Sequence, residues 1–226
     1  MREGRSHVGL LMAGGRGTRM GGGVEKPLVE LEGKKMVEHV LDRLAAVRSL
    51  SRVICVTSRF APRTTEFLRR MGYEVIEAPG GGYLEDLKFA LSALGPGLYA
   101  TFSADVPFLV PEVVEELLSR HSRGDLSEMD YVVVVVREEL VKSFGTSLRS
   151  ATRYTVDGRP LFPTGVRLIR YKGGSVDAAL SSPHFVTVED PGFAVNVNTP
   201  EDLRIAEAIA GAARSGYLGP ETSTAG

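Results

Sequence analysis

Glycines and cationic side chains are concentrated in one short stretch near the N-terminus, LLMAGGRGTRMGGGVEKPL over residues 10–28. An apolar run over residues 8–12 leads into it, and Lys26-Pro27 closes it. Glycine lets a ligand approach the backbone closely, and the N–H groups of such a loop can bind phosphate oxygens. Arg16 and Arg19 add positive charge to the same loop. The stretch therefore predicts a binding site for a nucleoside triphosphate.

The spacing within this loop excludes two better-known phosphate-binding motifs. A Walker loop needs Gly-Lys-Ser/Thr, whereas Lys26 lies between Glu25 and Pro27. A dinucleotide-binding G-x-G-x-x-G motif that starts at Gly15 would need glycine where Met20 stands. The alternative is a flexible turn with solvated arginines, but the order of apolar strand, small residues, basic residues and Lys-Pro favours a triphosphate site.

An aspartate follows a predicted buried strand over residues 98–103. Asp105 lies in the segment TFSADVP over residues 101–107. Ligands of parallel α/β sheets bind at the carboxyl ends of the strands, and one carboxylate there can hold Mg²⁺ against substrate phosphates. The alternative is that Asp105 only starts a turn before Pro107. We predict that Asp105 is a metal ligand.

Two alternating asparagines, Asn196 and Asn198, lie in FAVNVNTP over residues 193–200. We expect a short strand over residues 193–197 that turns both amides to one side, with Asn198 beside a helix N-terminus. An amide oxygen there can contact a metal or a phosphate without adding negative charge, so Asn198 is the second predicted metal ligand. The alternative is the ordinary use of asparagine in turns and caps.

A second glycine cluster, residues 80–82, precedes the sequence YLEDL. Glycines allow a flat ring to lie against the backbone. A carboxylate at the following helix start can accept hydrogen bonds from the N1–H and amino groups of guanine, so Glu85 or Asp86 would favour guanine over adenine. An equally simple interpretation is that both acids only interact with the helix dipole.

Strand and helix patterns alternate through the first two thirds of the chain. The alternation predicts right-handed crossovers and a mainly parallel sheet covered on both faces, hence an α/β fold. The predicted strands cover residues 7–12, 52–57, 73–77, 98–103 and 131–136, and the predicted helices cover residues 36–44, 62–71, 84–94 and a segment that begins at Pro111.

The pattern loosens beyond residue 137. Asp157-Gly158 predicts a hairpin turn between residues 154–156 and residues 161–162. Further short strands are expected over residues 166–169 and 185–188. Thr199-Pro200 predicts the N-cap and first turn of a last helix.

Composition limits the class of protein. The chain has 226 residues with 27 Lys and Arg against 28 Asp and Glu, so no basic field indicates nucleic acid binding. The one cysteine, Cys55, lies in an apolar run and is expected in the core. No run approaches the ~20 apolar residues of a membrane helix, and no signal peptide is recognisable. We predict a cytoplasmic protein with one domain over residues 1–212, a flexible tail over residues 213–226 and no membrane insertion.

Together these residues resemble the nucleotidyltransferases of the molybdenum-cofactor guanylyltransferase type, which begin with L-x-A-G-G-x-G-x-R-M and continue to Lys-Pro or Lys-Gly. Here the motif reads MAGGRGTRM over residues 12–20, with Met12 as a volume-conserving replacement for Leu. The chain is more similar still to the archaeal GTP:adenosylcobinamide-phosphate guanylyltransferases, through GYLEDL over residues 82–87 and NVNT over residues 196–199. The likeness is weak over residues 137–183, where the acceptor should bind.

The resemblance implies a Rossmann-like three-layer α/β/α fold with a mainly parallel mixed sheet, of the nucleotide-diphospho-sugar transferase type. It implies transfer of GMP from GTP to the phosphate of adenosylcobinamide phosphate, with Mg²⁺ as cofactor and with GTP and a corrinoid phosphate as small-molecule partners. It is compatible with a homodimer. The implied catalytic residues are Arg19, Lys26 and Asp105, and Asp105 and Asn198 would hold the metal. The implied nucleotide-binding residues are Met12, Ala13, Gly14, Gly15, Arg16, Gly17, Thr18, Gly81, Gly82, Glu85, Asp86 and Asn198.

Three other functions stay open on the sequence. The first is another NTP transferase, either a molybdenum-cofactor guanylyltransferase or an enzyme with a cytidylyl donor or a sugar-phosphate acceptor. The second is a regulatory domain that binds GTP without catalysis, which Arg19, Lys26 and Asp105 disfavour because binding alone needs no metal ligand opposite a leaving group. The third is a dehydrogenase, which Met20 disfavours by breaking the dinucleotide motif.

Overall fold

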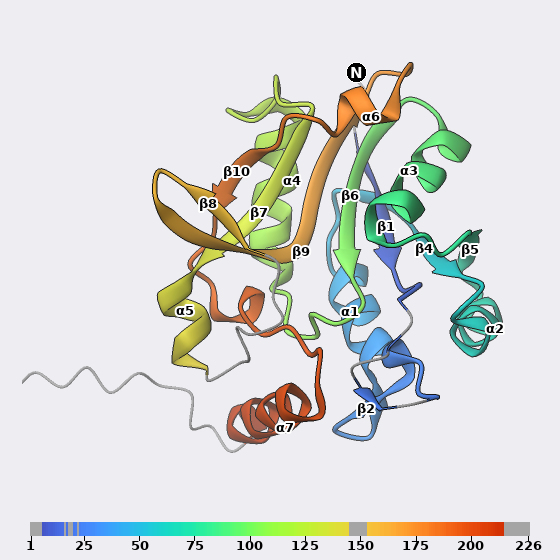
Figure 1. Ribbon diagram of the computed structural model, residues 1–226, viewed down its shortest axis with the longest axis vertical. Helices are drawn as coiled ribbons and strands as arrows, with labels where there is room; N and C mark the ends of the chain where they lie inside the picture. The colour runs from blue at the N-terminus through green and yellow to red at the C-terminus, as the bar shows by residue number, and fades with distance from the viewer. Residues whose placement is uncertain (1–5, 16, 18–19, 22, 145–152, 215–226) are drawn as a thin grey trace, which may run out of the picture.

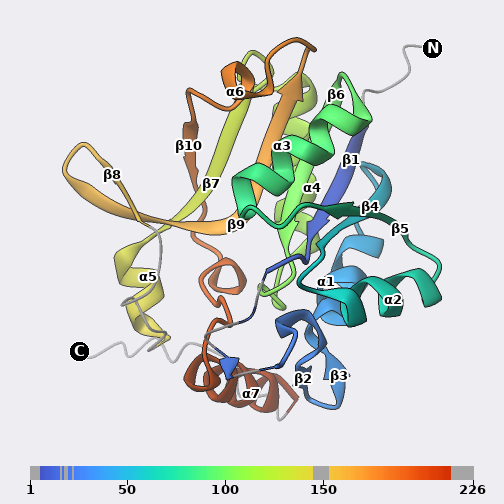
Figure 2. The same cartoon turned by 45° about the vertical axis from the view of Figure 1, so that its right-hand side comes forward.

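The computed structural model describes residues 6–15, 17, 20, 21, 23–144 and 153–214. A mixed sheet forms the middle layer and helices cover both of its faces (Figures 1 and 2). The predicted α/β architecture of three layers is therefore confirmed. Residues 215–226 of the predicted tail lie outside the described part, as do Arg16, Thr18 and Arg19 of the glycine loop.

The sheet runs in the order β10-β7-β9-β6-β1-β4-β5, with β8 paired to β9. Strand β9 is antiparallel to β6, β7 and β8, and the other pairs are parallel. A separate antiparallel hairpin joins β2 (Glu30–Leu31) to β3 (Lys34–Lys35). The strands of the sheet are β1 (His7–Met12), β4 (Leu50–Ser58), β5 (Glu74–Ala78), β6 (Gly97–Ser103), β7 (Tyr131–Arg137), β8 (Tyr154–Val156), β9 (Arg159–Tyr171) and β10 (His184–Thr187).

The central strands are apolar on both faces because both faces are covered. On β1, Leu10 and Leu11 are each 0% exposed and belong to opposite clusters of the core. Cys55 is also buried, as predicted, and burial raises the pKa of its thiol to about 12. One face carries α1 (Met36–Ala45), α2 (Pro62–Arg70) and α4 (Pro111–Arg123), and the other carries α3 (Tyr83–Leu94) and α6 (Val176–Ala179).

Helices α5 (Glu138–Ser143) and α7 (Pro200–Arg214) lie nearer the carboxyl edge of the sheet, where α7 contacts β2 (Figure 1). Two short 3-10 helices, η2 (Lys26–Leu28) and η4 (Pro191–Phe193), complete the described elements. Among the described helices, none has both the length and the apolar composition that a membrane crossing requires.

The first five predicted strands and the four predicted helices are confirmed in type and order. The hairpin turn is confirmed as well, since Asp157 and Gly158 have φ values of 50° and 74°, the positive pair that a type I′ turn requires. The separate strands expected over residues 161–162 and 166–169 are wrong, because both belong to the single strand β9. Strand β9 bends at Gly165, where φ is +81° and an added Cβ would lie 2.7 Å from the Cβ of Ser103.

The strand expected over residues 193–197 is also wrong. Phe193 ends η4, and residues 195–198 form no strand within the described chain. Val195 and Val197 are 1% and 0% exposed in a small cluster with Leu31, Met36 and Ala206. The N–H of Val197 donates to the carbonyl of Asp105 at 2.9 Å. The alternation of apolar and polar residues therefore reflects real burial, but no strand of the described residues pairs with this segment.

Candidate nucleotide-binding site

A cavity of about 530 Å³ opens at the carboxyl ends of the parallel strands. This volume suits a ligand the size of a nucleotide. Its walls come from the loops after β1, β5 and β6, from β9 and from the segment before α7. Of the predicted site residues, the cavity brings together Met12, Ala13, Gly14, Gly15, Lys26, Gly81, Gly82, Asp86, Asp105 and Asn198.

The loop after β1 uses its first two glycines differently. A Cβ on Gly14 would lie 2.9 Å from the carbonyl carbon of Thr57, so the backbone must pack directly on the end of β4. The hydroxyl of Ser58 donates to the Gly14 carbonyl and fixes that contact. Among the described residues, no heavy atom would lie within 4 Å of a Cβ on Gly15. Gly14 thus anchors the loop, and Gly15 presents open backbone to the cavity. Gly17 does not line the cavity; it turns the loop, with φ at +62°.

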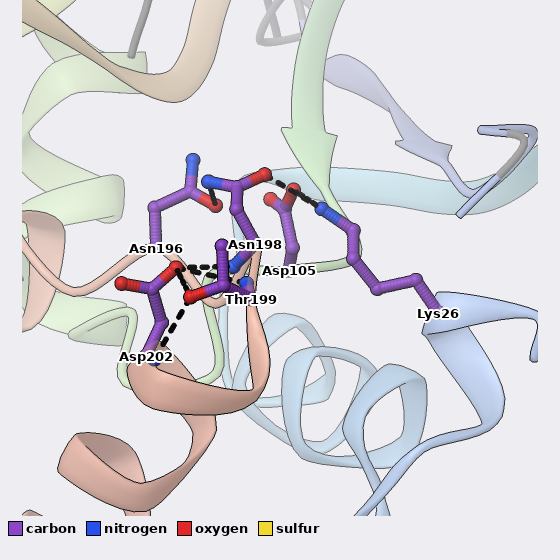
Figure 3. A network of polar contacts seen from close by, with 6 residues as sticks. All are labelled: Lys26, Asp105, Asn196, Asn198, Thr199 and Asp202. Carbon is purple, nitrogen blue, oxygen red and sulfur yellow. Dashed lines mark hydrogen bonds and ion pairs between the residues drawn. The ribbon is translucent and has the colours of Figure 1, made fainter. Parts of the chain in front are cut away.

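Lys26 reaches across the cavity wall to two predicted metal ligands (Figure 3). Its ammonium forms an ion pair with Oδ2 of Asp105 and donates to Oδ1 of Asn198 at 3.0 Å. The side chains of Lys26 and Asp105 are 19% and 14% exposed. The pair is therefore shielded from bulk water while it stays open to the cavity.

The start of α7 holds Asn198 in place. The Asp202 carboxylate accepts hydrogen bonds from the N–H groups of Asn198 and Thr199 at 3.0 and 2.9 Å. In return, Oγ1 of Thr199 accepts from the Asp202 N–H at 3.2 Å, which confirms the predicted cap. The Asn198 amide also donates to Oδ1 of Asn196 at 2.9 Å. These bonds leave the Asn198 amide oxygen directed at Lys26 (Figure 3).

The chemistry around Asp105 fits a divalent cation. Its Oδ1 atom is buried and has no hydrogen-bond partner within the described chain, so it is an acceptor without a donor. Over the same residues, no group of three or more His, Cys, Asp or Glu side chains could hold a metal. A cation at Asp105 would therefore need further oxygens from amides, water or a ligand, which is how Mg²⁺ is held when it bridges substrate phosphates.

The second glycine cluster places its two acids differently. Asp86 is 5% exposed, and its Oδ1 accepts from the Gly80 N–H at 2.8 Å, so this carboxylate closes the glycine loop from inside. Glu85 is exposed, pairs with Lys88 at 2.8 Å and does not line the cavity. Recognition of guanine by Glu85 or Asp86 stays a prediction.

Glu25 is a structural residue that the sequence analysis missed. Its carboxylate accepts from the N–H groups of Arg63 and Thr64 at 2.9 and 2.6 Å, and from the Thr64 hydroxyl at 2.6 Å. It thereby caps α2, whose own N-cap residue, Ala61, has no capping side chain. The sequence Ala61-Pro62 indicates a helix start whose N-cap residue has no side chain to accept from the first N–H groups. It does not show that Glu25 supplies the acceptor.

Arg167 is the second residue that the sequence analysis missed. It extends from β9 into the cavity wall, and its guanidinium lies 4.0 Å from the centre of the Tyr83 ring. No motif surrounds it in the sequence, and it belongs to the segment in which the family likeness is weak.

Comparison with known proteins gives a consistent result. A family model described as the MobA-like NTP transferase domain matches residues 9–170. The chain is 28% identical over 208 residues to the adenosylcobinamide-phosphate guanylyltransferase of Methanocaldococcus jannaschii, covering 88% of this chain and 95% of that protein. It is 30% identical over 210 residues to the molybdenum cofactor guanylyltransferase of Shewanella woodyi, covering 89% and 96%.

A solved structure supports the fold. CMP:2-keto-3-deoxy-manno-octonic acid synthetase complexed with CTP superposes with a TM-score of 0.63 at 18% identity, covering 91% of this chain and 98% of that one. The likeness confirms that the three-layer arrangement is the fold of nucleotidyltransferases.

Proposed function

This chain belongs to the MobA-like NTP transferase family, and on that premise we propose that it transfers GMP from GTP to adenosylcobinamide phosphate. An oxygen of the acceptor phosphate attacks the α-phosphorus of GTP. The bond from that phosphorus to the oxygen bridging to the β-phosphate breaks. The products are adenosylcobinamide-GDP and pyrophosphate.

The reaction asks for positioning and charge neutralisation rather than for proton transfer. A phosphate monoester is largely ionised at neutral pH, with a second pKa of about 6, so the nucleophile needs no general base. Two anionic groups must instead be brought together and a polyanionic leaving group stabilised. The cavity offers cations and backbone N–H groups for that purpose.

One observation carries the proposal. The Lys26 ammonium is held at the cavity wall by Asp105 and Asn198, and the open backbone of Gly15 lines the same cavity. We assign the triphosphate to the backbone of Gly14 and Gly15. Lys26 would stabilise the α-phosphate and the departing pyrophosphate. Arg19 lies outside the described residues, and its role in the same step stays a prediction.

Asp105 and Asn198 would hold Mg²⁺. The unpartnered Oδ1 atom of Asp105 supports its part in this role, whereas the Asn198 amide oxygen accepts a hydrogen bond from Lys26, so its part as a ligand stays a prediction. The bound ion would supply positive charge to the phosphate oxygens. The chain's own contribution is to keep this carboxylate in place: the Asp105 carbonyl accepts from the Val197 N–H at 2.9 Å, which ties the loop after β6 to the segment that carries Asn198.

A molybdenum-cofactor guanylyltransferase is the second candidate function. The 30% identity to the Shewanella woodyi protein favours it as much as the 28% identity to the Methanocaldococcus jannaschii protein favours the first. The two candidates share the donor and differ in the acceptor. The GYLEDL block over residues 82–87 supports the cobinamide acceptor through the resemblance that the sequence shows. The cytoplasmic location and the homodimer stay predictions.

The test is an assay of purified protein with GTP, Mg²⁺ and adenosylcobinamide phosphate. We expect release of pyrophosphate and a product with the mass of adenosylcobinamide-GDP, with GTP preferred over CTP and ATP. Pyrophosphate release with GTP and molybdopterin, but not with GTP and adenosylcobinamide phosphate, would support the second candidate function instead. Binding of GTP without pyrophosphate release from either acceptor would support a regulatory domain and contradict the proposal.

A further inference from the structure

Among the described residues, Arg167 places a partly buried positive charge in the cavity wall without a carboxylate to pair with it. It lies in the middle of the sheet, in register with Thr101 of β6 and Val133 of β7. Its Nε atom is buried and has no hydrogen-bond partner in the described chain. Over the same residues, no carboxylate lies within ion-pair distance of the guanidinium.

The neighbours of this guanidinium are aromatic. Its carbon lies 4.0 Å from the centre of the Tyr83 ring, and that ring is fixed by a 2.8 Å hydrogen bond between the Tyr83 and Thr101 hydroxyls. Tyr131 and Tyr154 are the other groups that interact with its charge, and a tyrosine hydroxyl is neutral at pH 7. Stacking on Tyr83 attracts the cation and orients it, but it does not neutralise it.

A charged group with a buried and unpaired N–H is costly to a fold, and a ligand of opposite charge would offset that cost. Arg167 lines the same cavity as Lys26 and Asp105. A guanidinium presents two parallel N–H donors to a phosphate, which suits it to a dianionic phosphate monoester better than a single ammonium.

The cavity that Arg167 lines also has an apolar part. The glycine loop, Lys26 and Asp105 form the part to which the triphosphate is assigned above. Val141 of α5 and Phe162 and Pro163 of β9 line the same cavity and form an apolar wall. The cavity therefore offers a further cation and an apolar wall that the triphosphate assignment does not use.

We propose that Arg167 binds the phosphate monoester of the second substrate, with its organic body against the apolar wall. This inference rests on the proposed function and deepens it: the acceptor class is a phosphate carried on a large, partly apolar group. Arg167 would hold the acceptor phosphate in place for its attack on the nucleotide.

The test compares Arg167→Met and Arg167→Lys with Lys172→Met. Lys172 directly follows β9, has a side chain 66% exposed and does not line the cavity, so its variant removes a similar charge elsewhere. With adenosylcobinamide phosphate as acceptor, Arg167→Met is expected to raise the acceptor KM by at least about tenfold and to leave the Kd for GTP within about twofold. The acceptor KM of Arg167→Lys is expected to lie between those of the wild type and Arg167→Met. The acceptor KM of Lys172→Met is expected to equal that of the wild type. An unchanged acceptor KM, or an equal loss of GTP affinity, would overturn the proposal.

A second readout separates this inference from the proposed function. If the wild type turns over neither acceptor, inorganic phosphate is titrated calorimetrically into protein saturated with GTP. We expect binding to the wild type and to Lys172→Met and none to Arg167→Met. Equal phosphate binding by all three would overturn the assignment whatever the enzyme's substrate. If Arg167→Met does not fold, Arg167→Lys is used for both measurements. A wild-type acceptor KM and wild-type phosphate binding in Arg167→Lys would then contradict the proposal.

Discussion

The ammonium of Lys26 donates a 3.0 Å hydrogen bond to the amide oxygen of Asn198, 172 positions further along the chain. The same ammonium pairs with Asp105, so the end of the glycine loop, the loop after β6 and the segment before α7 meet at one cation. Each of these segments follows or precedes a packed element, and the cation joins them only in the folded protein.

Replacing Lys26 tests the role of that cation. We predict that Lys26→Ala slows guanylyl transfer by about 30- to 1,000-fold, which is about 2–4 kcal/mol in barrier height, because a preorganised charge on the phosphates is lost. The fold should persist, since the Asp105 side chain keeps some contact with solvent. Pyrophosphate release and circular dichroism measure the two effects. Near-normal turnover would eliminate the phosphate assignment.

Gly14 and Gly15 give a matched pair of alanine variants. A methyl group on Gly14 meets the backbone of Thr57 at 2.9 Å, so Gly14→Ala should destabilise the fold by about 1–3 kcal/mol. A methyl group on Gly15 meets no atom within 4 Å in the described part of the chain, so Gly15→Ala should change the free energy of unfolding by less than about 0.5 kcal/mol. It should nevertheless weaken GTP binding by about tenfold, because the methyl group takes space at the proposed phosphate site. Urea unfolding measures the stability of both variants, and calorimetry measures their affinity for GTP. A wild-type GTP affinity in Gly15→Ala would contradict the prediction.

Glu25 ties the glycine loop to α2 through three hydrogen bonds. Glu25→Gln keeps the shape but removes the charge at a helix N-terminus, so it should lower the free energy of unfolding by about 1–2 kcal/mol. It should also lower kcat, because Lys26 is the next residue. Glu66→Gln is the control, since Glu66 lies on α2 with a 69% exposed side chain. Equal stability of the two variants would show that the cap contributes nothing.

The histidine pair at the opposite edge of the sheet predicts a pH dependence of stability. His7 and His121 are buried and hydrogen-bonded to each other at 2.8 Å. Burial first, then the positive charges of His121 and Arg170, lowers the pKa of His7 to about 3. Burial lowers the pKa of His121 to about 4. Because the unfolded chain takes up protons below about pH 6.5 and the folded one does not, stability is complete above that pH and falls as the pH drops.

The measurement is urea unfolding at about pH 7.5, 6 and 5, above the range in which ordinary carboxylates titrate. The free energy of unfolding should decline by up to about 1.4 kcal/mol per pH unit for each histidine. His7→Gln should decline less steeply, and His184→Gln, at an exposed position, should follow the wild type. A flat profile in the wild type would refute the prediction.

Local sequence patterns predicted most of the fold, because a helix or strand that is buried on one face or on both has a characteristic spacing of apolar residues. They also predicted that Lys26 and Asp105 lie at one edge of the sheet, because loops at the carboxyl ends of parallel strands share that edge. Asn198 lies at the same edge as predicted, although it directly follows no strand of the described residues. That rule does not reach Arg167, which comes from the antiparallel strand β9. Alternating burial also cannot show whether a neighbouring strand exists, and for this reason the sequence wrongly predicts a strand at Val195 and Val197, which lie in no strand of the described chain. The Glu25 and Asp86 carboxylates accept hydrogen bonds from backbone N–H groups. Every residue type except proline has such a group, so the sequence does not identify these partners.

The most direct test of the account is a crystal structure of the protein with Mg²⁺ and a non-hydrolysable GTP analogue. We predict that the triphosphate lies against the backbone of Gly14 and Gly15, with Nζ of Lys26 within hydrogen-bond distance of a phosphate oxygen. A nucleotide bound outside this cavity, or one whose phosphates point away from Lys26, would contradict it.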